Sequence, residues 1–500
     1  MVLNPEIAPK GSIVEQVCAF LQERSIEAYL VGGCVRDWLG RSSHDFDFAV
    51  AGDALKLARR VADRMGAAFV LLDEERGTGR VVTKGEDGQR LFIDFARLQG
   101  DDIIADLSRR DFTVNAIAVA VGADIGSRII DPYSGQRDLQ LGVVRAVSET
   151  AFDDDPLRTL RAVRLAAEMQ ASIEQETVRL LCEAVPLIAN VSAERVRDEL
   201  SKILALPGAL QNLRYLDEVG LLVVIIPELE TLKGVEQSAP HYLDVFEHSL
   251  ETVRRLEQVV DVVEGYNGEE VADGALSLIP LLLSPFFRQL SAHLLQTISG
   301  DRSRLTVLKL VALLHDLGKP ATKSFDDEGN IHFYGHEEEG AEVVGAILRR
   351  LRFGGNEVAL AKTIVANHMR PPLLAGEEVV TRRAVYRFFR DTGDAGVDTL
   401  LFYLADHLAT WGPNLRMARW RRRVELVASM LADYYERHQK VISPPKLISG
   451  YDLMEEFGLQ EGPRIGELLE AVREAQVEGE VRTKEEALAL VKELLTQEFQ

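Results

Sequence analysis

Hydrophobic and polar residues follow two different patterns along the chain. Residues 12–24 have the spacing of an amphipathic helix, and after them come short runs that alternate like strands. These runs are AYLVGG, DFDFAV, AAFVLLD, GRVVTK, RLFIDFA and RIID, within residues 28–131. Because strand and helix patterns are interspersed up to about residue 150, this part predicts an α/β domain with a mixed or antiparallel sheet.

From Pro156 onward the apolar spacing is helical, with almost no strand signal. Two polar segments interrupt it: 267–274 predicts a loop, and 325–330 (FDDEGN) predicts the turn of a short hairpin. The expected architecture is an α/β head followed by a long all-α part. We expect four regions, with bounds 1–150, 151–240, 241–410 and 411–500.

Composition limits the class of protein. With 500 residues, 46% hydrophobic and 27% charged, the chain is an ordinary globular protein of several domains. It has no apolar run long enough for a membrane span and no secretory leader, so we expect a cytoplasmic protein without a membrane partner. Cys18, Cys34 and Cys182 form no C-x-x-C pair, which predicts reduced, structural thiols.

The net charge of −22 disfavours general binding of nucleic acid. However, five arginines lie close together without an intervening acid: Arg416, Arg419, Arg421, Arg422 and Arg423. They predict either a local positive patch or a solvated helix face that pairs with nearby acids.

The stretch from Gly32 to Asp47 joins a glycine turn to paired acids. Gly32 and Gly33 permit a sharp turn close to a triphosphate, and Arg36 can bind phosphate oxygens. On a strand, Asp45 and Asp47 share one face. Hard oxygen ligands of this kind favour Mg²⁺ together with substrate phosphates. The alternative is a surface strand that follows a glycine turn.

Two further segments could complete such a site. Asp94 lies in a strand between apolar neighbours and is a candidate third catalytic carboxylate; otherwise it is a residue at a strand edge. Residues 109–116 (RRDFTVNA) contain polar groups that can bind a triphosphate and ribose, namely Arg109, Arg110, Asp111 and Asn115. The alternative is a helix start capped by Asp111 or Thr113.

The segment DDDPLRTLRAVR (153–164) could read a base. With Pro156 in a first helical turn, Asp155 and Arg158 fall three apart on one face. An Asp accepts from an exocyclic amine and an Arg donates to a ring nitrogen, which is a pattern complementary to cytosine or adenine. The alternative is a helix N-cap followed by a basic face.

A second group of residues suits a divalent metal that activates water for phosphoester hydrolysis. Its members lie on helical segments in the order His248, His315, Asp316, His336, His368 and Asp406. The segment LLHDLGKPATK resembles the HD phosphohydrolase superfamily. In this resemblance Lys319 is placed to bind a phosphate, and the site has enough ligands for one or two metals. The metal's identity stays open.

Five motifs together resemble the bacterial (class II) tRNA nucleotidyltransferase and poly(A) polymerase family. They are GGxVRD with DxD (32–47), RRDFTxNA (109–116), DPxxGxxDL (131–139), DPLRxLRxxR (155–164) and ERxxxELxKxL (194–204). The resemblance implies a polymerase-β-like head, a neck, a body with an HD domain, and a tail. It assigns the four regions to the head, the base-templating neck and body, the HD phosphohydrolase and an RNA-binding tail.

The resemblance also implies roles for residues. Asp45 and Asp47 would hold Mg²⁺ with Asp94 as a third acid, while Asp155 and Arg158 would read the incoming base. The nucleotide site would further include Asp154, Arg161 and Arg164; the family commonly has Glu at the position of Asp154. A flexible loop within 73–80 is implied in switching from C to A addition.

The expected function is template-independent addition of C and A to the 3′ end of the tRNA acceptor arm from CTP and ATP. Alternatives are a partial CC- or A-adding enzyme, a poly(A) polymerase, an HD phosphohydrolase with a nucleotide-sensing head, and a purely RNA-binding protein. An acidic chain without a basic tail disfavours the poly(A) polymerase.

Overall fold

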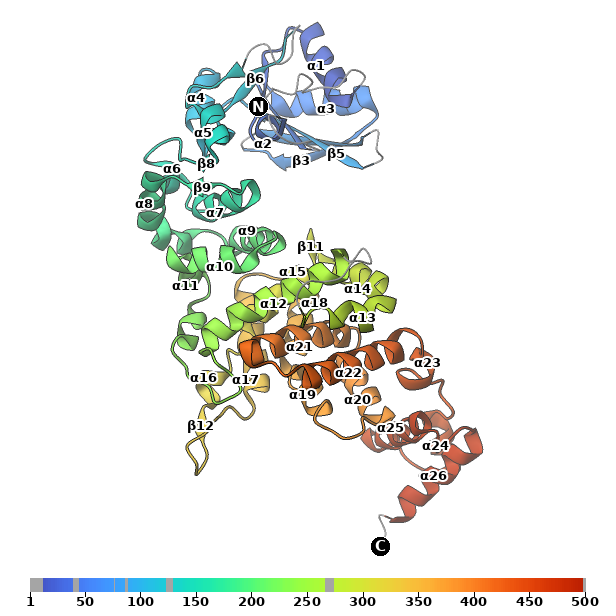
Figure 1. Cartoon of the computed structure of the whole chain (residues 1–500). Helices are drawn as coiled ribbons and strands as arrows, with labels where there is room; N and C mark the ends of the chain where they lie inside the picture. Colours follow the sequence, from blue (N-terminus) through green and yellow to red (C-terminus); the bar gives the residue numbers. More distant parts are fainter. Residues whose placement is uncertain are drawn as a thin grey trace. The chain divides into compact units, whose positions relative to one another are not determined.

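The computed structural model describes residues 12–38, 45–75, 77–85, 89–122, 129–265 and 274–497. The chain divides into two compact units, Met1–Glu199 with Tyr215–Ile225, and Leu200–Arg214 with Ile226–Gln500. Figure 1 shows a sheet with flanking helices in the first unit and mainly helices in the second. The predicted loop 267–274 lies almost entirely outside the described residues.

The first unit is built on a seven-stranded sheet of order β3-β4-β5-β2-β1-β6-β7. The strands are β1 Ala28–Val31, β2 Asp45–Val50, β3 Ala68–Asp73, β4 Thr78–Lys84, β5 Arg90–Arg97, β6 Ala118–Ala120 and β7 Ile129–Ile130. β2 and β5 pair in parallel and the other neighbours are antiparallel, so the prediction of a mixed sheet is confirmed. β6 was not predicted, because a run of only three apolar residues shows no alternation of hydrophobic and polar positions.

Both faces of the sheet are covered by helices. α1 (Ile13–Glu23) and α3 (Ala54–Met65) share one core with Leu30, Phe48 and Phe95. On the other face, α4 (Ile103–Ser108) packs against Val31, Ala49 and Ala118. The short helices α2 (Gly33–Trp38), η1 (Thr113–Asn115) and α5 (Gly135–Leu141) complete this region.

The first unit continues as helices joined by a two-stranded sheet, β8 (Val143–Val144) with β9 (Ser172–Ile173). The helices are α6 Ala151–Asp154, α7 Arg158–Met169, α8 Gln175–Ala184, η2 Val185–Asn190, α9 Ala193–Ala205, α10 Ala209–Glu218 and α11 Leu221–Ile225. α9 and α10 each run across a boundary between the two units. The start of α7 differs from prediction: Asp155 has extended backbone angles and ends α6, so Asp155 and Arg158 do not share one helix.

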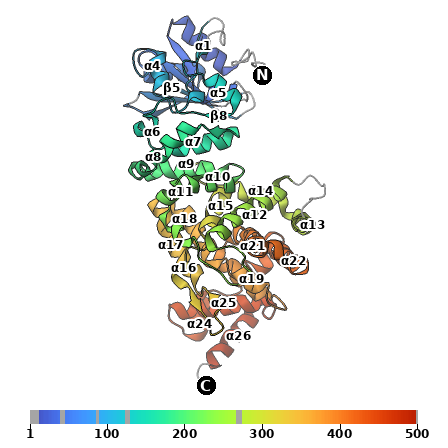
Figure 2. The same cartoon turned by 60° about the vertical axis from the view of Figure 1, so that its left-hand side comes forward.

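The second unit surrounds a helix that is buried along most of its length, α21 (Ala395–Trp411). It packs against α12 (Val245–Gly265), α15 (Arg304–Leu314), α18 (Gly355–Asn367), α20 (Arg382–Thr392) and α22 (Met417–Tyr435). Figure 2 shows these helices from a second direction. A helix that is apolar on all sides, such as α21, can be enclosed by other helices. The few polar side chains on α21 are therefore held in defined positions inside the unit.

Shorter elements fill the rest of the second unit. They are η3 Pro227–Leu232, α13 Leu278–Leu283, η4 Ser284–Phe286, α14 Phe287–Leu294, β10 Thr297–Ser299, β11 Arg302–Ser303, α16 Lys319–Thr322, β12 Ser324–Phe325, β13 Ile331–His332, α17 His336–Arg350, α19 Arg370–Leu374, η5 Gly412–Asn414 and α23 His438–Val441. β12 and β13 pair as the hairpin predicted around residues 325–330.

The last three helices are α24 (Gly450–Phe457), α25 (Pro463–Glu478) and α26 (Lys484–Gln497), as the helical pattern predicted. They have their own small core around Leu453, Leu468 and Val491.

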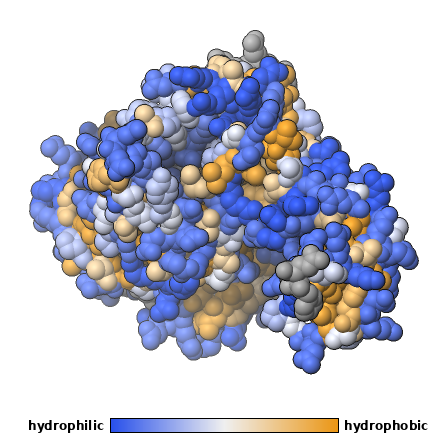
Figure 3. All heavy atoms as spheres, turned by 90° about the horizontal axis from the view of Figure 1, so that it is seen from below, coloured by the Kyte–Doolittle hydropathy of each residue, from blue (hydrophilic) through white to orange (hydrophobic). Residues whose placement is uncertain are grey.

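In Figure 3 hydrophilic residues cover most of the visible face, and hydrophobic ones occur in small groups. None of the helices among the described residues is long and apolar enough to cross a membrane.

Candidate functional sites in the head and the HD domain

The acids of the first unit meet at the middle of the sheet. β2 and β5 are in parallel register, with Asp47 opposite Asp94. One residue on, Phe48 and Phe95 are opposite each other and stack in the core with ring centroids 5.2 Å apart. The phenylalanines therefore anchor both strands and present the acids on the other side. Asp45 is exposed at the start of β2.

The environment of Asp47 disfavours its charged form. Burial, followed by the neighbouring charges of Asp94 and Asp45, raises the pKa of Asp47 to about 6, although Arg110 and Arg80 act in the opposite direction. A bound cation would relieve this repulsion, and carboxylate oxygens are the ligands that Mg²⁺ prefers. Asp45 and Asp47 therefore fit a divalent metal.

Asp94 is held by an arginine that sequence reasoning placed in a loop. Arg80 lies on β4 opposite Asp94 and donates from Nε to Oδ1 and from a terminal nitrogen to Oδ2, both at 2.8 Å. Thr78, Gly79 and Arg80 are part of β4, so the connection from Asp73 is shorter than the predicted loop; Arg76 is outside the described residues. This two-bond pair fixes the carboxylate beside Asp47.

The glycine turn lies next to the same acids. Gly32 has a φ of +75°, and a Cβ added there would lie 3.2 Å from Asp47 Oδ2 and 3.4 Å from Arg110 Nη1. Gly33 opens α2. Arg110 is positioned by the buried Asp106, which accepts from Arg110 Nη2 at 2.9 Å. The structure thus brings Gly32, Asp47, Asp94 and Arg110 together.

A second set of predicted residues forms a chain of contacts. Arg36 Nη1 donates to Asn115 Oδ1 at 2.9 Å, and Asn115 Nδ2 donates to Asp111 Oδ1 at 3.0 Å. Asp111 is buried and lies 3.1 Å from Arg161 Nη2. Burial alone would raise the pKa of Asp111, but Arg161, Asn115 and the Phe112 amide outweigh it and lower that pKa. This chain connects α2 and η1 with α7.

The alternative of a helix start at residues 109–116 is wrong. Only the three residues of η1 are helical there, and the cap position is Phe112. Thr113 instead donates from Oγ1 to the buried Asp138 Oδ2 at 2.7 Å. Arg109 is exposed at the end of α4.

The proposed base-reading residues bind other groups in this structure. Arg158 donates to the carbonyl oxygens of Ala151 and Arg109 at 3.0 and 2.6 Å. Asp155 Oδ2 accepts from Arg195 Nη2 at 2.7 Å. The Arg158 main-chain amide donates to the Asp155 carbonyl oxygen at 3.0 Å, and the described contacts include no hydrogen bond between the two side chains.

Two predicted residues lie apart from the rest. Asp154 is exposed, with only a long contact of 3.4 Å from Thr150 Oγ1. Arg164 donates to Glu199 Oε2 at 2.7 Å and to Glu168 Oε1 at 2.6 Å, and Glu199 is buried. Arg164 is therefore committed to packing α7 against α9, and the structure does not bring it into the group.

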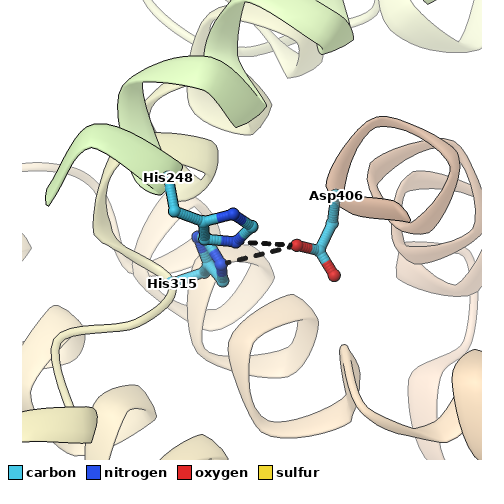
Figure 4. A group of neighbouring side chains, drawn as sticks. All are labelled: His248, His315 and Asp406. Atoms are coloured by element: carbon cyan, nitrogen blue, oxygen red, sulfur yellow. Dashed lines mark ion pairs between the residues drawn. The ribbon is translucent and has the colours of Figure 1, made fainter. Parts of the chain in front are cut away.

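The predicted HD residues converge from five helices and one loop. His248 lies on α12, His315 ends α15, His336 begins α17, His368 ends α18 and Asp406 lies on α21. They form two groups whose ligand atoms lie within 4.8 Å of one another: His248, His315 and Asp406, and Asp316, His336 and His368. Figure 4 shows the first group, with both imidazoles directed at Asp406.

Close backbone packing makes this convergence possible. A Cβ at Gly318 would lie 2.1 Å from the His336 carbonyl oxygen and 2.7 Å from the Gly340 nitrogen. Only glycine allows the loop after α15 to touch α17 at this distance. His315 and Asp316, just before this glycine, are thereby held next to His336.

The histidines are oriented for metal binding. His315, His336 and His368 each place Nδ1 within 2.6–3.0 Å of a main-chain carbonyl, those of Ala312, Phe333 and Val365. In the neutral imidazole, Nδ1 then carries the proton, and Nε2 has a lone pair that can bind a metal. The Nε2 atoms of His336 and His368 lie only 3.2 Å apart. Two lone pairs at this distance repel each other unless a bound cation or a proton on one ring lies between them.

The acids of the cluster support the same conclusion. His248 Nε2 lies 3.0 Å from Asp406 Oδ1, and His315 Nε2 lies 3.1 Å from Asp316 Oδ2. Burial opposes the charge on Asp316, but His315 and Lys319 lower its pKa well below the usual value. Among the described residues, both Asp316 oxygens and His248 Nε2 are buried and have close ion-pair partners, but none of these contacts has the geometry of a hydrogen bond. This donor set fits a divalent metal.

A pocket of about 630 Å³ opens over the cluster. Lys319 lines the wall of this pocket, and its Nζ lies 2.7 Å from Asp316 Oδ2. The other walls include the β13 hairpin strand, Tyr403, His407 and Arg423. Its volume suits a nucleotide-sized ligand.

Sequence reasoning missed several residues that hold the sites. Arg80, Asp106 and Asp138 position the head residues, and His241 lines the HD pocket with its ring 5.2 Å from that of His248. Burial, together with Lys319, lowers the pKa of His241 to about 3. The position of the acids Asp106 and Asp138 among apolar neighbours is the one sequence signal that could have indicated these two residues. The buried Cys18 and Cys34 are free thiols, and Cys182 is exposed and free.

Comparisons with known families match both parts of the chain. Residues 28–145 match "Poly A polymerase head domain", 172–233 match "Probable RNA and SrmB- binding site of polymerase A", 245–411 match "HD domain", and 385–491 match the tRNA nucleotidyltransferase domain 2 family. The chain is 36% identical to the A-adding tRNA nucleotidyltransferase of Deinococcus radiodurans, over 93% of this chain and 94% of that protein.

It is also 36% identical to the CC-adding tRNA nucleotidyltransferase of Thermus thermophilus, over 93% of each chain. A solved complex of a CCA-adding enzyme with ATP has a similar fold, with a TM-score of 0.62, 24% identity and coverage of 96% of this chain and 94% of that chain. The fold is that of a nucleotidyltransferase head followed by an HD domain. The chain belongs to the class II tRNA nucleotidyltransferase and poly(A) polymerase family, and both kinds of domain imply divalent metals.

Proposed function

We propose that this protein adds C and A nucleotides to the 3′ end of tRNA, from CTP and ATP, and completes the CCA sequence. The observation that carries the proposal is the meeting of Asp47, Asp94, Gly32 and Arg110 at the middle of the head sheet. The relatives named for A addition and for CC addition support the same reaction on the same end of tRNA.

In this reaction the tRNA 3′ oxygen attacks the α-phosphorus, the bond to the β-phosphate oxygen breaks, and pyrophosphate leaves. Asp45 and Asp47 would hold Mg²⁺, which lowers the pKa of the attacking hydroxyl and neutralises the leaving group. Asp94, fixed by Arg80, contributes a third carboxylate to the same face. The turn at Gly32 allows the backbone to approach the triphosphate, and Arg110 supplies positive charge beside it.

Base selection is assigned to Asp155 and Arg158. A guanidinium carries five N–H donors, so the two carbonyl bonds of Arg158 orient it and leave donors for a ring nitrogen. Each carboxylate oxygen of Asp155 can accept a further bond from an exocyclic amine beside its contacts with Leu157 and Arg195. Arg36, Arg109, Asn115, Asp111 and Arg161 would bind the triphosphate and ribose and keep α7 in place.

The second unit carries a phosphohydrolase in this proposal. The two His/Asp groups would hold one or two divalent metals, and a water oxygen would attack phosphorus while the ester bond breaks and the leaving oxygen takes a proton. Lys319 would bind the phosphate. We accordingly divide the chain into a head at 1–150, a neck and body at 151–240, an HD domain at 241–410 and an RNA-binding tail at 411–500.

A partial enzyme is the second candidate. Because relatives named for A addition and CC addition have the same identity to this chain, resemblance alone does not favour either partial reaction. The connection between β3 and β4 lies where the family resemblance implies a loop for switching to A, which supports the complete reaction.

Paired variants test the division of labour. Asp45→Asn with Asp47→Asn should abolish incorporation of labelled CTP and ATP into tRNA while phosphate release by the HD domain continues. His315→Ala with Asp316→Ala should do the reverse. Incorporation by the first variant would overturn the nucleotidyltransferase assignment, and loss of both activities in either variant would mean that the sites are not separate.

A further inference from the structure

One wall of the HD pocket carries polar groups that the metal cluster does not use. Tyr403 and His407 lie one turn apart on α21, and both line the pocket with Asp406. The Tyr403 hydroxyl and His407 Nε2 are buried, in side chains only 1% and 7% exposed, and form no hydrogen bond with the described residues. A buried polar atom without a hydrogen-bond partner costs free energy, so a ligand atom is the natural partner.

Arg423 completes this wall from α22. Its Nε is also buried without a hydrogen bond, Nη1 lies 3.4 Å from the Pro372 carbonyl oxygen, and the guanidinium interacts with the Tyr403 side chain. The ion pairs of the described residues do not include Arg423. By contrast, Lys319 on the opposite side is paired with Asp316 at 2.7 Å. Arg423 therefore brings a positive charge to the pocket and has no ion-pair partner within 4.0 Å among the described residues.

The neighbouring arginine Arg421 has a different environment. It is exposed and donates from Nε to Glu425 Oε1 at 2.9 Å, four residues further along α22. Only Arg423 of the five clustered arginines lines the pocket. The predicted positive patch is therefore divided between a solvated helix face and one residue that faces the HD site.

We propose that Tyr403, His407 and Arg423 bind a second phosphate of the substrate whose first phosphate is hydrolysed at the His/Asp cluster. The pocket then takes a nucleotide that carries two phosphates, as a free bisphosphate or as a phosphorylated RNA end. This inference rests on the proposed phosphohydrolase activity. It follows from geometry: Asp406 faces His248 and His315 (Figure 4), and the adjacent His407 lines the same pocket as Arg423. A planar guanidinium and a hydroxyl are suitable donors for phosphate oxygens.

The test compares substrates with one and two phosphates on the full-length protein with Mn²⁺. The probes are adenosine 3′-monophosphate, adenosine 3′,5′-bisphosphate and a dinucleotide with a 3′-phosphate; phosphate release is measured. Arg423→Gln should raise KM for both two-phosphate substrates at least tenfold and leave kcat/KM for the monophosphate within twofold. Arg423→Lys should recover part of the loss, and Arg421→Gln should behave like the wild type.

The two two-phosphate probes distinguish the sources, because a free bisphosphate and an RNA end would differ in kcat/KM. An equal effect of Arg423→Gln on all three probes, or no effect, would overturn the proposal. If the wild type releases no phosphate from any probe, the hydrolase assignment fails and equilibrium binding of adenosine 3′,5′-bisphosphate decides. Loss of one binding site in Arg423→Gln, with an unchanged melting temperature, would then support the subsite, and unchanged binding would refute it.

Discussion

Asp47 of β2 lies directly opposite Asp94 of β5 in the parallel register of the head sheet. The two carboxylates are adjacent because the stacked Phe48 and Phe95 fix both strands one residue further on. Arg80 neutralises Asp94 through two bonds, and no equivalent pair is described for Asp47. Asp47 thus retains an electrostatic cost that a metal would remove.

Removal of the Asp47 charge should stabilise the metal-free head at neutral pH. The pKa of Asp47 is raised from 3.8 to about 6 in the folded state, so the folded protein binds this proton more tightly than the unfolded chain. Its contribution to stability is full below the unfolded pKa and is lost as the pH rises through 6. In EDTA, Asp47→Asn should exceed the wild type by about 2 to 3 kcal/mol at pH 8, and by about 1 kcal/mol less at pH 5.

Native-state hydrogen exchange of β5 amides measures this difference. Asp101→Asn, at an exposed carboxylate of the same unit, is the control and should show no such trend. Mg²⁺ should stabilise the wild type but not Asp47→Asn. A variant that is less stable than the wild type at pH 8 in EDTA would contradict the described repulsion.

The sequence predicted the acids more reliably than their partners. Alternation along DFDFAV places Asp45 and Asp47 on one face whatever the neighbouring strand is. Strand order and register depend on contacts between distant residues, so the opposition of Asp47 and Asp94, and the pairing of Arg80 across β4, could not be read from spacing.

Gly32→Ala should impair nucleotide addition. The added Cβ would crowd Asp47 Oδ2 and Arg110 Nη1, and a φ of +75° adds about 1 kcal/mol of strain. We expect kcat/KM for CTP incorporation to fall at least tenfold. Gly66→Ala is the matched control, since Gly66 has a φ of +62° with no atom within 4 Å of the added Cβ. Equal losses in both variants would mean that backbone strain alone is responsible.

Arg161→Met should destabilise the first unit, because it leaves the buried Asp111 without its cation. Loss of one partner of a buried carboxylate costs about 2 kcal/mol or more. The pKa of Asp111 is lowered in the folded state, so its stabilising effect is present at neutral pH and declines as the pH falls through that pKa. The variant should therefore differ less from the wild type in acid.

Urea unfolding at two pH values checks this, with Arg179→Met as the control. Arg179 forms exposed pairs with Glu176 and Glu183 in α8, so its replacement should have no measurable effect. If Arg161→Met proves as stable as the wild type, Asp111 does not depend on this ion pair.

His368→Ala should lower metal binding in the HD domain. The Nε2 atoms of His336 and His368 face each other at 3.2 Å, and burial with the neighbouring His315 and His336 lowers the pKa of His368 to about 3, so His368 is a neutral ligand at pH 7. Metal analysis after incubation with Mn²⁺ and gel filtration should show fewer bound ions than in the wild type. The exposed His438→Ala is the control; a reduced metal content there would make the assay uninformative about position.

The HD residues were predictable as a set but not as two groups. Their order and types indicate a metal, whereas the separation into groups around Asp406 and Asp316 depends on how α12, α17, α18 and α21 pack. Arg164 shows the opposite failure. Its position in the DPLRxLRxxR motif predicted a nucleotide contact, but the buried Glu199 on α9 binds it instead.

The most direct test of the central claim is incorporation of labelled CTP and ATP, with Mg²⁺, into tRNA transcripts that end before CCA, after C and after CC. We predict that this single protein extends all three to complete CCA. Extension by C alone on the first two, or by A alone on the third, would contradict complete CCA addition and identify a partial enzyme that works with a second protein. No extension of any transcript would contradict nucleotidyl transfer to tRNA itself.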